Sequence, residues 1–421
     1  MTKKIKIVTL SDHPLSPSGV GTQTKYVCEA LLKTGRYEII SLGGAIKHAN
    51  YNHINVEPYG KDWKVIPVDG YGNPQMIRSI LRTEKPDLLW FMTDPRFWGW
   101  LWQIENEIRP LVPMVYYHVW DNYPYPHFNK RYYDSNDLIV TISKVTDDIV
   151  KTVSPNVKSI YLPHAVNSDV FKLLGETETE DIRSNSLQKE DRGKTVFFWN
   201  NRNARRKQSG TLIWWFKEWL DKTDNHDKAM LIMHTDPRDQ HGQNLEHIIN
   251  ELGLDKRQVL LSTSKLSPES LAGLYNMVDC TINISDAEGF GLATLESLSC
   301  GTPIIVNMTG GLQEQVTNGH DWFGIGLRPT SKAIIGSQDV PYIYEDRTSK
   351  EQFFSALTKM MALGPAGRRE MGLKGRQHVE ANYNFTDFNK NWVKAIDDLV
   401  ESKSSWSDRK EYNGIRFKEV A

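Results

Sequence analysis

The sequence predicts an α/β protein made of two doubly wound domains, each with a parallel sheet between layers of helices. The chain has 421 residues, more than a single hydrophobic core usually organises. Short apolar, β-branched runs alternate with amphipathic helical segments along most of its length, which is the pattern of a parallel sheet. A strand leading through a glycine-containing loop into a helix occurs once in each half of the chain.

The composition is that of an ordinary soluble protein. Hydrophobic residues make up 39% and charged residues 24% of the chain. The net charge of −1 argues against a protein that binds nucleic acid through an overall basic surface. No apolar run reaches the ~18 residues of a membrane span, and the start, MTKKIKIVTL, lacks the apolar core of a signal peptide. We therefore expect a cytoplasmic protein, and the three scattered cysteines predict neither a disulfide framework nor a zinc site.

The first domain is predicted over residues 1–174. Its expected strands are 5–10, 37–42, 63–68, 88–92, 111–118 and 138–143. The first strand runs into a loop with Gly19 and Gly21, a type of loop whose backbone can approach a phosphate closely. His118 stands at the carboxyl end of a strand, which is the edge where open α/β sheets bind ligands.

Residues 120–133 (WDNYPYPHFNKRYY) are rich in aromatic and basic side chains and are too irregular to predict a helix. Aromatic rings beside cations are able to stack a sugar ring, or a base next to phosphates. Alternatively, the rings pack the loop itself, and the sequence leaves both interpretations open. The candidate ligand-binding residues of this stretch are Tyr123, Tyr125, Lys130 and Arg131, and Asp121 is added to them by the resemblance given below, which implies binding of an acceptor.

A polar, acidic stretch at 175–193 has no hydrophobic periodicity and predicts a linker. The second domain is expected over 194–385, and a terminal helix and tail over 386–421 return to the first domain. A strand at 194–199 enters a loop with four basic residues, which predicts a compact anion site. These four residues are Arg202, Arg205, Arg206 and Lys207. The glycine-rich segment 320–344 is interpreted as an insertion of unassigned role.

The most informative stretch is 285–315 (SDAEGFGLATLESLSCGTPIIVNMTGGLQEQ), which follows a predicted strand. A glycine turn at 288–291 leads into a helix, whose N-terminus favours an anion, above all a phosphate. Glu288 lies in the turn and Glu296 lies just inside the helix. Because a carboxylate beside a phosphate would repel it, we expect both to bind hydroxyls, one of a sugar and one of a ribose.

The two glutamates eight residues apart, with EGFG between them and CGTP behind, resemble the signature of retaining glycosyltransferases of the GT-B fold, family 4 in particular. The resemblance covers nearly the whole chain and is strongest over 259–315. It implies two facing Rossmann-like domains, with the donor bound mainly by the second. The chain departs from the family pattern at Asn200 and Asn201, where Val-Gly is usual, and at His164 and Ala165, which replace Asn-Gly.

The resemblance also implies roles for individual residues. In the family, the first glutamate (here Glu288) contacts the donor sugar and the second (Glu296) contacts the ribose. Arg202 and Lys207 match the spacing of the arginine and lysine that bind the diphosphate, and His118 matches a histidine close to the sugar. The remaining expected donor-binding residues are Gly19, Gly21, Ser285, Gly289, Phe290, Gly291 and Leu292.

The implied activity is the transfer of a hexose from a nucleoside-diphosphate sugar to an acceptor hydroxyl with retention of configuration. No Asp-x-Asp motif occupies a strand end, so we expect no metal and no cofactor besides the donor itself. Arg202, Lys207 and helix N-termini would neutralise the leaving diphosphate while the acceptor attacks from the same face. A UDP-sugar is the expected donor, although the sequence does not distinguish UDP from GDP or ADP.

The sequence does not identify the acceptor. A glycan, a lipid-linked sugar or a small molecule is the first expectation. The alternative is a hydroxymethylated pyrimidine in duplex DNA, as for phage glucosyltransferases, which would need a basic rim and a pocket for a flipped base. A further alternative is a non-catalytic protein that binds sugar nucleotides, because a fold alone does not determine function.

Overall fold

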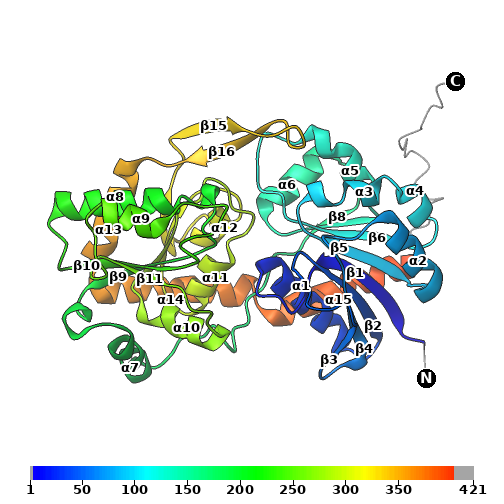
Figure 1. Cartoon of the computed structure of the whole chain (residues 1–421), viewed down its shortest axis with the longest axis horizontal. Coiled ribbons are helices and arrows are strands. Elements are labelled where there is room, and N and C mark those ends of the chain that lie inside the picture. The colour runs from blue at the N-terminus through cyan, green and yellow to red at the C-terminus, as the bar shows by residue number, and fades with distance from the viewer. Residues whose placement is uncertain (1–2, 403–421) are drawn as a thin grey trace. The chain divides into compact units, whose positions relative to one another are not determined.

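The computed structural model describes residues 3–402 and divides the chain into two α/β units, each with its own sheet (Figure 1). The first unit comprises Met1–Ala165, Gly336–Ile343 and Thr386–Ala421, and the second comprises Val166–Ile335 and Tyr344–Phe385. The predicted fold class, two doubly wound domains, is confirmed. The predicted boundary at 174 lies nine residues inside the second unit, since that unit begins at 166.

The first unit is built on an eight-stranded sheet. Its strands are β1 (Ile5–Asp12), β2 (Tyr37–Gly44), β3 (Ile54–Val56), β4 (Gly60–Pro67), β5 (Leu88–Met92), β6 (Met114–His118), β7 (Leu138–Thr141) and β8 (Ser159–Tyr161). They lie in the order β3-β4-β2-β1-β5-β6-β7-β8, and every pair is parallel except β3 with β4. The strand order therefore reverses between β1 and β5.

Helices cover both faces of this sheet because its strands carry apolar side chains at successive positions. The helices of the unit are α1 (Gly19–Leu32), α2 (Pro74–Glu84), α3 (Gly99–Trp102), α4 (Glu105–Ile108), α5 (Lys130–Asp134), α6 (Lys144–Val153) and α15 (Phe385–Ser402). Leu10 and Phe91 face a cluster that includes Trp102 of α3. Trp90, the neighbour of Phe91, points to the opposite face and packs edge-on against Trp392 of α15.

The second unit contains a six-stranded sheet in which every pair is parallel. Its strands are β9 (Thr195–Asn200), β10 (Ala229–His234), β11 (Val259–Ser262), β12 (Cys280–Asn283), β13 (Ile304–Asn307) and β14 (Gly324–Leu327). The order is β11-β10-β9-β12-β13-β14, so the chain moves outward from β9, returns beside it with β12 and continues to the other edge. The reversal point between β9 and β12 is where such sheets bind ligands.

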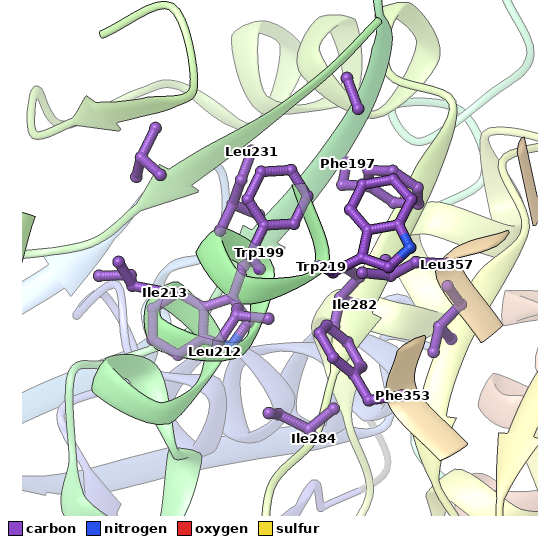
Figure 2. Close-up of a cluster of buried hydrophobic side chains, with 14 of the residues drawn as sticks. Phe197, Trp199, Leu212, Ile213, Trp219, Leu231, Ile282, Ile284, Phe353 and Leu357 are labelled. Carbon is purple, nitrogen blue, oxygen red and sulfur yellow. The ribbon is translucent and has the colours of Figure 1, made fainter. Parts of the chain in front are cut away.

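Two layers of helices hold this sheet (Figure 1). The helices are α7 (Glu176–Ser186), α8 (Ser209–Thr223), α9 (Leu245–Glu251), α10 (Pro268–Met277), α11 (Leu292–Ser299), α12 (Leu312–Val316), α13 (Lys350–Ala362) and α14 (Gly364–Asn382). Figure 2 shows the core beneath α8 and α13, where Trp199, Trp219 and Phe353 are completely buried. The Trp219 indole donates to Thr358 Oγ1 over 3.0 Å. This packing gives the loops at the strand ends a rigid support.

The prediction of a linker at 175–193 was wrong, because this stretch forms α7 and a short 3₁₀ turn at Lys189–Asp191. Helix α7 buries none of its residues completely, so it lacks the apolar stripe that reveals a helix in a sequence. Arg183 anchors it instead. Its guanidinium donates to the Met277 carbonyl over 2.7 Å and pairs with Asp279 at 3.3 Å.

The segment 320–344, interpreted as an insertion, contributes the edge strand β14 and the start of a two-stranded hairpin. That hairpin consists of β15 (Ser331–Ile335) and β16 (Ile343–Arg347). Helix α15, the expected terminal helix, groups with the first unit, where the Asp397 carboxylate pairs with the Arg36 guanidinium at 2.8 Å. The rest of the predicted tail, from 403 on, lies outside the described residues. Between residues 3 and 402, no helix is both long and apolar enough to cross a membrane.

Candidate functional site

The loops that follow β9 and β12 meet at the reversal point of the second sheet. The loop after β9 carries the basic residues of 202–207, and the loop after β12 carries the glycine turn of 288–291. Because parallel strands place their carboxyl ends at one edge, two motifs more than 80 residues apart in sequence become neighbours here. The structure thus brings the predicted anion site and the predicted glutamate turn together.

A buried ion pair joins the two loops. Lys207 Nζ donates to Glu288 Oε2, and Asn283 Nδ2 donates to the same oxygen over 3.3 Å. The side chains of Lys207 and Glu288 are only 9% and 11% exposed. Burial alone would raise the pKa of Glu288, but the charges of Lys207 and Arg206 outweigh it and hold that pKa below its ordinary value. Glu288 is therefore a carboxylate at neutral pH and can only accept hydrogen bonds.

Glycine shapes the turn between Glu288 and α11. Gly291 has a φ of +91°, and a β-carbon there would lie 2.5 Å from Leu312 Cδ2. The turn brings the first residues of α11 beside Glu288, whose carbonyl accepts from the Gly311 N–H over 3.1 Å. No described side chain caps α11. Its first-turn N–H groups thus form, with Lys207, a site suited to an anion.

A second carboxyl lies on α11 itself. Glu296 Oε2 accepts from the Tyr275 hydroxyl over 2.9 Å, and that hydroxyl accepts from Asn200 Nδ2 over 2.8 Å. Burial raises the pKa of Glu296 to about 7, although the hydrogen bond from Tyr275 opposes the shift. This carboxyl therefore changes its protonation state close to neutral pH.

Among the predicted donor-binding residues, Ser285 and Phe290 are buried beside Glu288 in the same stretch as Gly289 and Leu292. The Ser285 hydroxyl donates to Asn283 Oδ1 and so supports the strand end. Arg202 does not join the Lys207–Glu288 pair. Its side chain is 62% exposed, and its guanidinium binds Asp239 at 2.7 Å and His241 at 2.8 Å.

Asn283 and Tyr275 belong to the site although sequence reasoning did not select them, and Arg206 was expected only as part of the basic run, without a role of its own. The Arg206 guanidinium donates to the carbonyl of Ala287, the residue before Glu288, and its charge lowers the pKa of Glu288. Its position next to Lys207 in a basic run was a usable signal. No local pattern pointed to Tyr275, since its hydroxyl lies beside Glu296 only through the packing of α10 on α11.

In the first unit, His118 is completely buried at the end of β6. Its Nε2 lies 2.8 Å from the Tyr133 hydroxyl, and burial lowers its pKa to about 3, so the ring is neutral. The histidine that was predicted to contact the sugar is therefore not accessible to a ligand in this structure. Gly19 begins α1, and the Gly21 N–H donates to the N-cap hydroxyl of Ser18 over 2.9 Å.

The candidate acceptor residues of 120–133 engage one another and neighbouring helices. The hydroxyls of Tyr123 and Tyr125 both donate to Asp148 of α6, over 2.8 and 3.0 Å. Lys130 pairs with Asp134, and both lie in α5, a helix that the sequence analysis did not expect. Arg131 stacks over the Tyr132 ring, and Asp121 is partly exposed. These contacts favour the interpretation that the rings pack the loop itself.

Within residues 3–402, no group of three or more His, Cys, Asp or Glu side chains is arranged to hold a metal ion. The three cysteines are buried, free thiols.

Comparison with known sequences identifies the part of the chain that holds this site. Residues 180–334 match the family described as glycosyl transferases group 1. The chain is 36% identical over 149 residues to a D-inositol 3-phosphate glycosyltransferase of Corynebacterium urealyticum, which is 30% of this chain and 34% of that protein. The D-inositol 3-phosphate glycosyltransferase of Corynebacterium jeikeium is 36% identical to this chain over 77 residues, which is 18% of each chain. The chain thus spans about a fifth to a third of the length of these relatives. An uncharacterized glycosyltransferase of Methanocaldococcus jannaschii is 23% identical over 360 residues, 79% of this chain and 87% of that one.

Solved structures resemble the chain over almost its whole length. Sucrose-phosphate synthase from Thermosynechococcus elongatus has a TM-score of 0.75 at 17% identity, covering 95% of this chain and all of that one. Anabaena HepE in complex with UDP and glucose has a TM-score of 0.68 at 14% identity, covering 94% of this chain and all of that one. At these identities the likeness shows the fold, whereas the family match covers the site. The chain has the GT-B fold, and its residues 180–334 match the family of glycosyl transferases of group 1.

Proposed function

We propose that the protein is a retaining, metal-independent glycosyltransferase that moves a hexose from a nucleoside-diphosphate sugar to an acceptor hydroxyl. The observation that carries this proposal is the buried Lys207–Glu288 pair at the β9–β12 reversal point, beside the uncapped N-terminus of α11. A cation, a helix N-terminus and a carboxylate that only accepts hydrogen bonds together suit a diphosphate joined to a sugar.

In the proposed mechanism, the donor diphosphate binds Lys207 and the first turn of α11, which neutralise the leaving group as its bond to the sugar breaks. Glu288, released from Lys207, accepts a hydrogen bond from a sugar hydroxyl and fixes the ring. Arg202 joins the diphosphate only after leaving Asp239, which makes Lys207 the principal cation. The acceptor hydroxyl attacks from the face of the leaving group and passes its proton to the departing diphosphate oxygen. The anomeric configuration is thereby retained without a protein nucleophile.

A UDP-sugar is the proposed donor, supported by the solved complex of HepE with UDP and glucose. The proposed acceptor is a glycan, a lipid-linked sugar or a small molecule. The buried free thiols are compatible with a cytoplasmic location. Glu296 is proposed to bind the ribose hydroxyls, which agrees with its place on α11 about one turn from the first residue of the helix.

The raised pKa of Glu296 makes sugar-nucleotide binding depend on pH. Below about 7 the carboxyl carries a proton, whereas above it both oxygens accept hydrogen bonds from ribose. Affinity for UDP-glucose should therefore increase severalfold between pH 6 and pH 8. In the Glu296→Gln variant this increase should disappear, and calorimetric titration at several pH values measures both. An increase that persists in the variant would remove Glu296 as its source.

The proposed function is tested by nucleoside-diphosphate release from a panel of UDP-, GDP- and ADP-hexoses. Each donor is combined with simple glycosides, with polyprenyl-phosphate sugars, or with duplex DNA that contains hydroxymethylpyrimidines. Release stimulated by a glycoside or lipid-linked acceptor is the expected result. Release stimulated by the modified DNA, and not by unmodified DNA, would assign the acceptor to DNA instead. No release with any donor would refute the proposed activity.

A further inference from the structure

The strand β16 reaches the loops of the proposed donor site from a part of the chain beyond the family match, which ends at residue 334. Two consecutive residues of β16, Glu345 and Asp346, make these contacts. They are therefore a feature of this chain that the family model does not describe.

Glu345 holds Arg205 with two hydrogen bonds. Arg205 Nη2 lies 2.6 Å from Glu345 Oε1, and Nη1 lies 3.1 Å from Oε2. The Glu345 side chain is 4% exposed, whereas the Arg205 side chain is 56% exposed. A planar, two-pronged pair of this kind fixes the orientation of the guanidinium. Glu345 also lies 3.9 Å from Arg347 Nη2, so Arg205 is the closer of its two arginine partners.

The backbone of β16 joins the same group of loops. The Asp346 N–H donates to the Asp286 carbonyl over 2.9 Å. Asn307 Nδ2 donates over 2.9 Å to both the Asp346 and the Ser285 carbonyls, and the Thr309 hydroxyl donates to the Asp346 carboxylate over 2.9 Å. Residue 345 thus stands on a strand fixed to the loops after β12 and β13, one residue from these bonds.

Arg205, Arg206 and Lys207 form a single 3₁₀ turn, so the position of the first residue constrains the other two. Arg206 and Lys207 contact the loop after β12, through the Ala287 carbonyl and the Glu288 carboxylate. Arg205 is held by Glu345 of β16. The turn is therefore anchored by the loop after β12 and by β16, and Glu345 provides the anchor from β16.

We propose that Glu345 is a positioning residue for the diphosphate site: by holding Arg205, it fixes the turn that presents Lys207 and Arg206 to the donor. This inference rests on the proposed function. The positioning role and the negative charge of Glu345 predict opposite effects on diphosphate binding when Glu345 is replaced. A carboxylate near a bound diphosphate repels it, so a purely electrostatic effect would tighten binding when the charge is removed, whereas loss of the anchor weakens it.

The test measures UDP, GDP and ADP binding by calorimetry for the wild type, for Glu345→Gln and for a matched control, Glu218→Gln. Glu218 pairs with Lys350 at 2.7 Å in the same unit and lies on α8, in a partly exposed ion pair. For the nucleotide that the wild type binds best, Glu345→Gln should raise the dissociation constant roughly tenfold. The control should bind as the wild type does. In an Arg205→Gln background, Glu345→Gln should have no further effect, because the two residues act as one unit.

Circular dichroism and thermal melting establish that each variant is folded at the temperature of the titration. If Glu345→Gln does not fold, Glu345→Asp keeps the charge but shortens the side chain, and the anchor model again predicts weaker binding. Unchanged or tighter binding by a folded Glu345 variant would overturn the inference while leaving the proposed function intact. Equal weakening in the Glu218 control would also overturn it. A wild type that binds none of the three nucleotides would refute the proposed function itself.

Discussion

Replacing Glu288 with alanine should abolish sugar transfer and leave nucleoside-diphosphate binding largely intact. The carboxylate is ionised and accepts hydrogen bonds only, so its proposed partner is a sugar hydroxyl and not the negatively charged diphosphate. Loss of an interaction that orients the reacting sugar should lower kcat at least roughly a hundredfold. Lys207 loses its ion-pair partner in this variant and remains available to the diphosphate.

The measurement compares kcat for transfer with the dissociation constant of UDP in the wild type and in Glu288→Ala. A suitable control is Glu314→Ala, which removes another buried glutamate in the same unit, on α12. Similar losses of transfer and of UDP binding in Glu288→Ala would contradict the role assigned to Glu288, because they would place it at the diphosphate or in the structure of the loop.

Replacing Lys207 with alanine should have two large effects. The principal cation of the proposed diphosphate site disappears, so UDP binding should fall to a level that calorimetry does not detect. In addition, Glu288 is left buried without its ion-pair partner, which should lower the free energy of unfolding by about 3 kcal/mol. Urea denaturation measures the second effect independently of the first.

The double variant Lys207→Ala with Glu288→Ala separates these effects. Removing both charges leaves no unpaired buried ion, so the free energy of unfolding should recover in large part relative to Lys207→Ala. UDP binding should not recover, because the cation is still missing. Recovery of binding along with stability would mean that Lys207 acts through the fold of the loop and not on the nucleotide.

Sequence patterns predicted the parts of the fold that local chemistry determines. The alternating strands and helices gave the doubly wound class, and the strand–loop–helix patterns placed the basic loop and the Glu288 turn each directly after a strand. The polar helix α7 was missed because none of its residues is buried and because Arg183 holds it partly through Met277 and Asp279, which lie 94 and 96 residues away in the sequence. A hydrophobic pattern cannot reveal a helix that is stabilised in this way.

The sequence indicated candidate residues for the site, but it could not indicate the contacts of their individual side chains. The spacing of Arg202 and Lys207 matched the family, but only the fold shows that Asp239 binds Arg202 while Glu288 binds Lys207. His118 was correctly placed at a strand end, yet its complete burial depends on Tyr133 and on packing that a strand pattern does not encode. The Arg205–Glu345 pair joins residues 140 positions apart and leaves no local signal.

The most direct test of the donor site is a crystal structure of the protein with the nucleoside diphosphate that it binds best among UDP, GDP and ADP. We expect the diphosphate within hydrogen-bond distance of Lys207 Nζ and of the first-turn N–H groups of α11, with Glu288 separated from Lys207. A diphosphate bound away from the carboxyl ends of β9 and β12, with the Lys207–Glu288 pair unchanged, would contradict the assignment of this site.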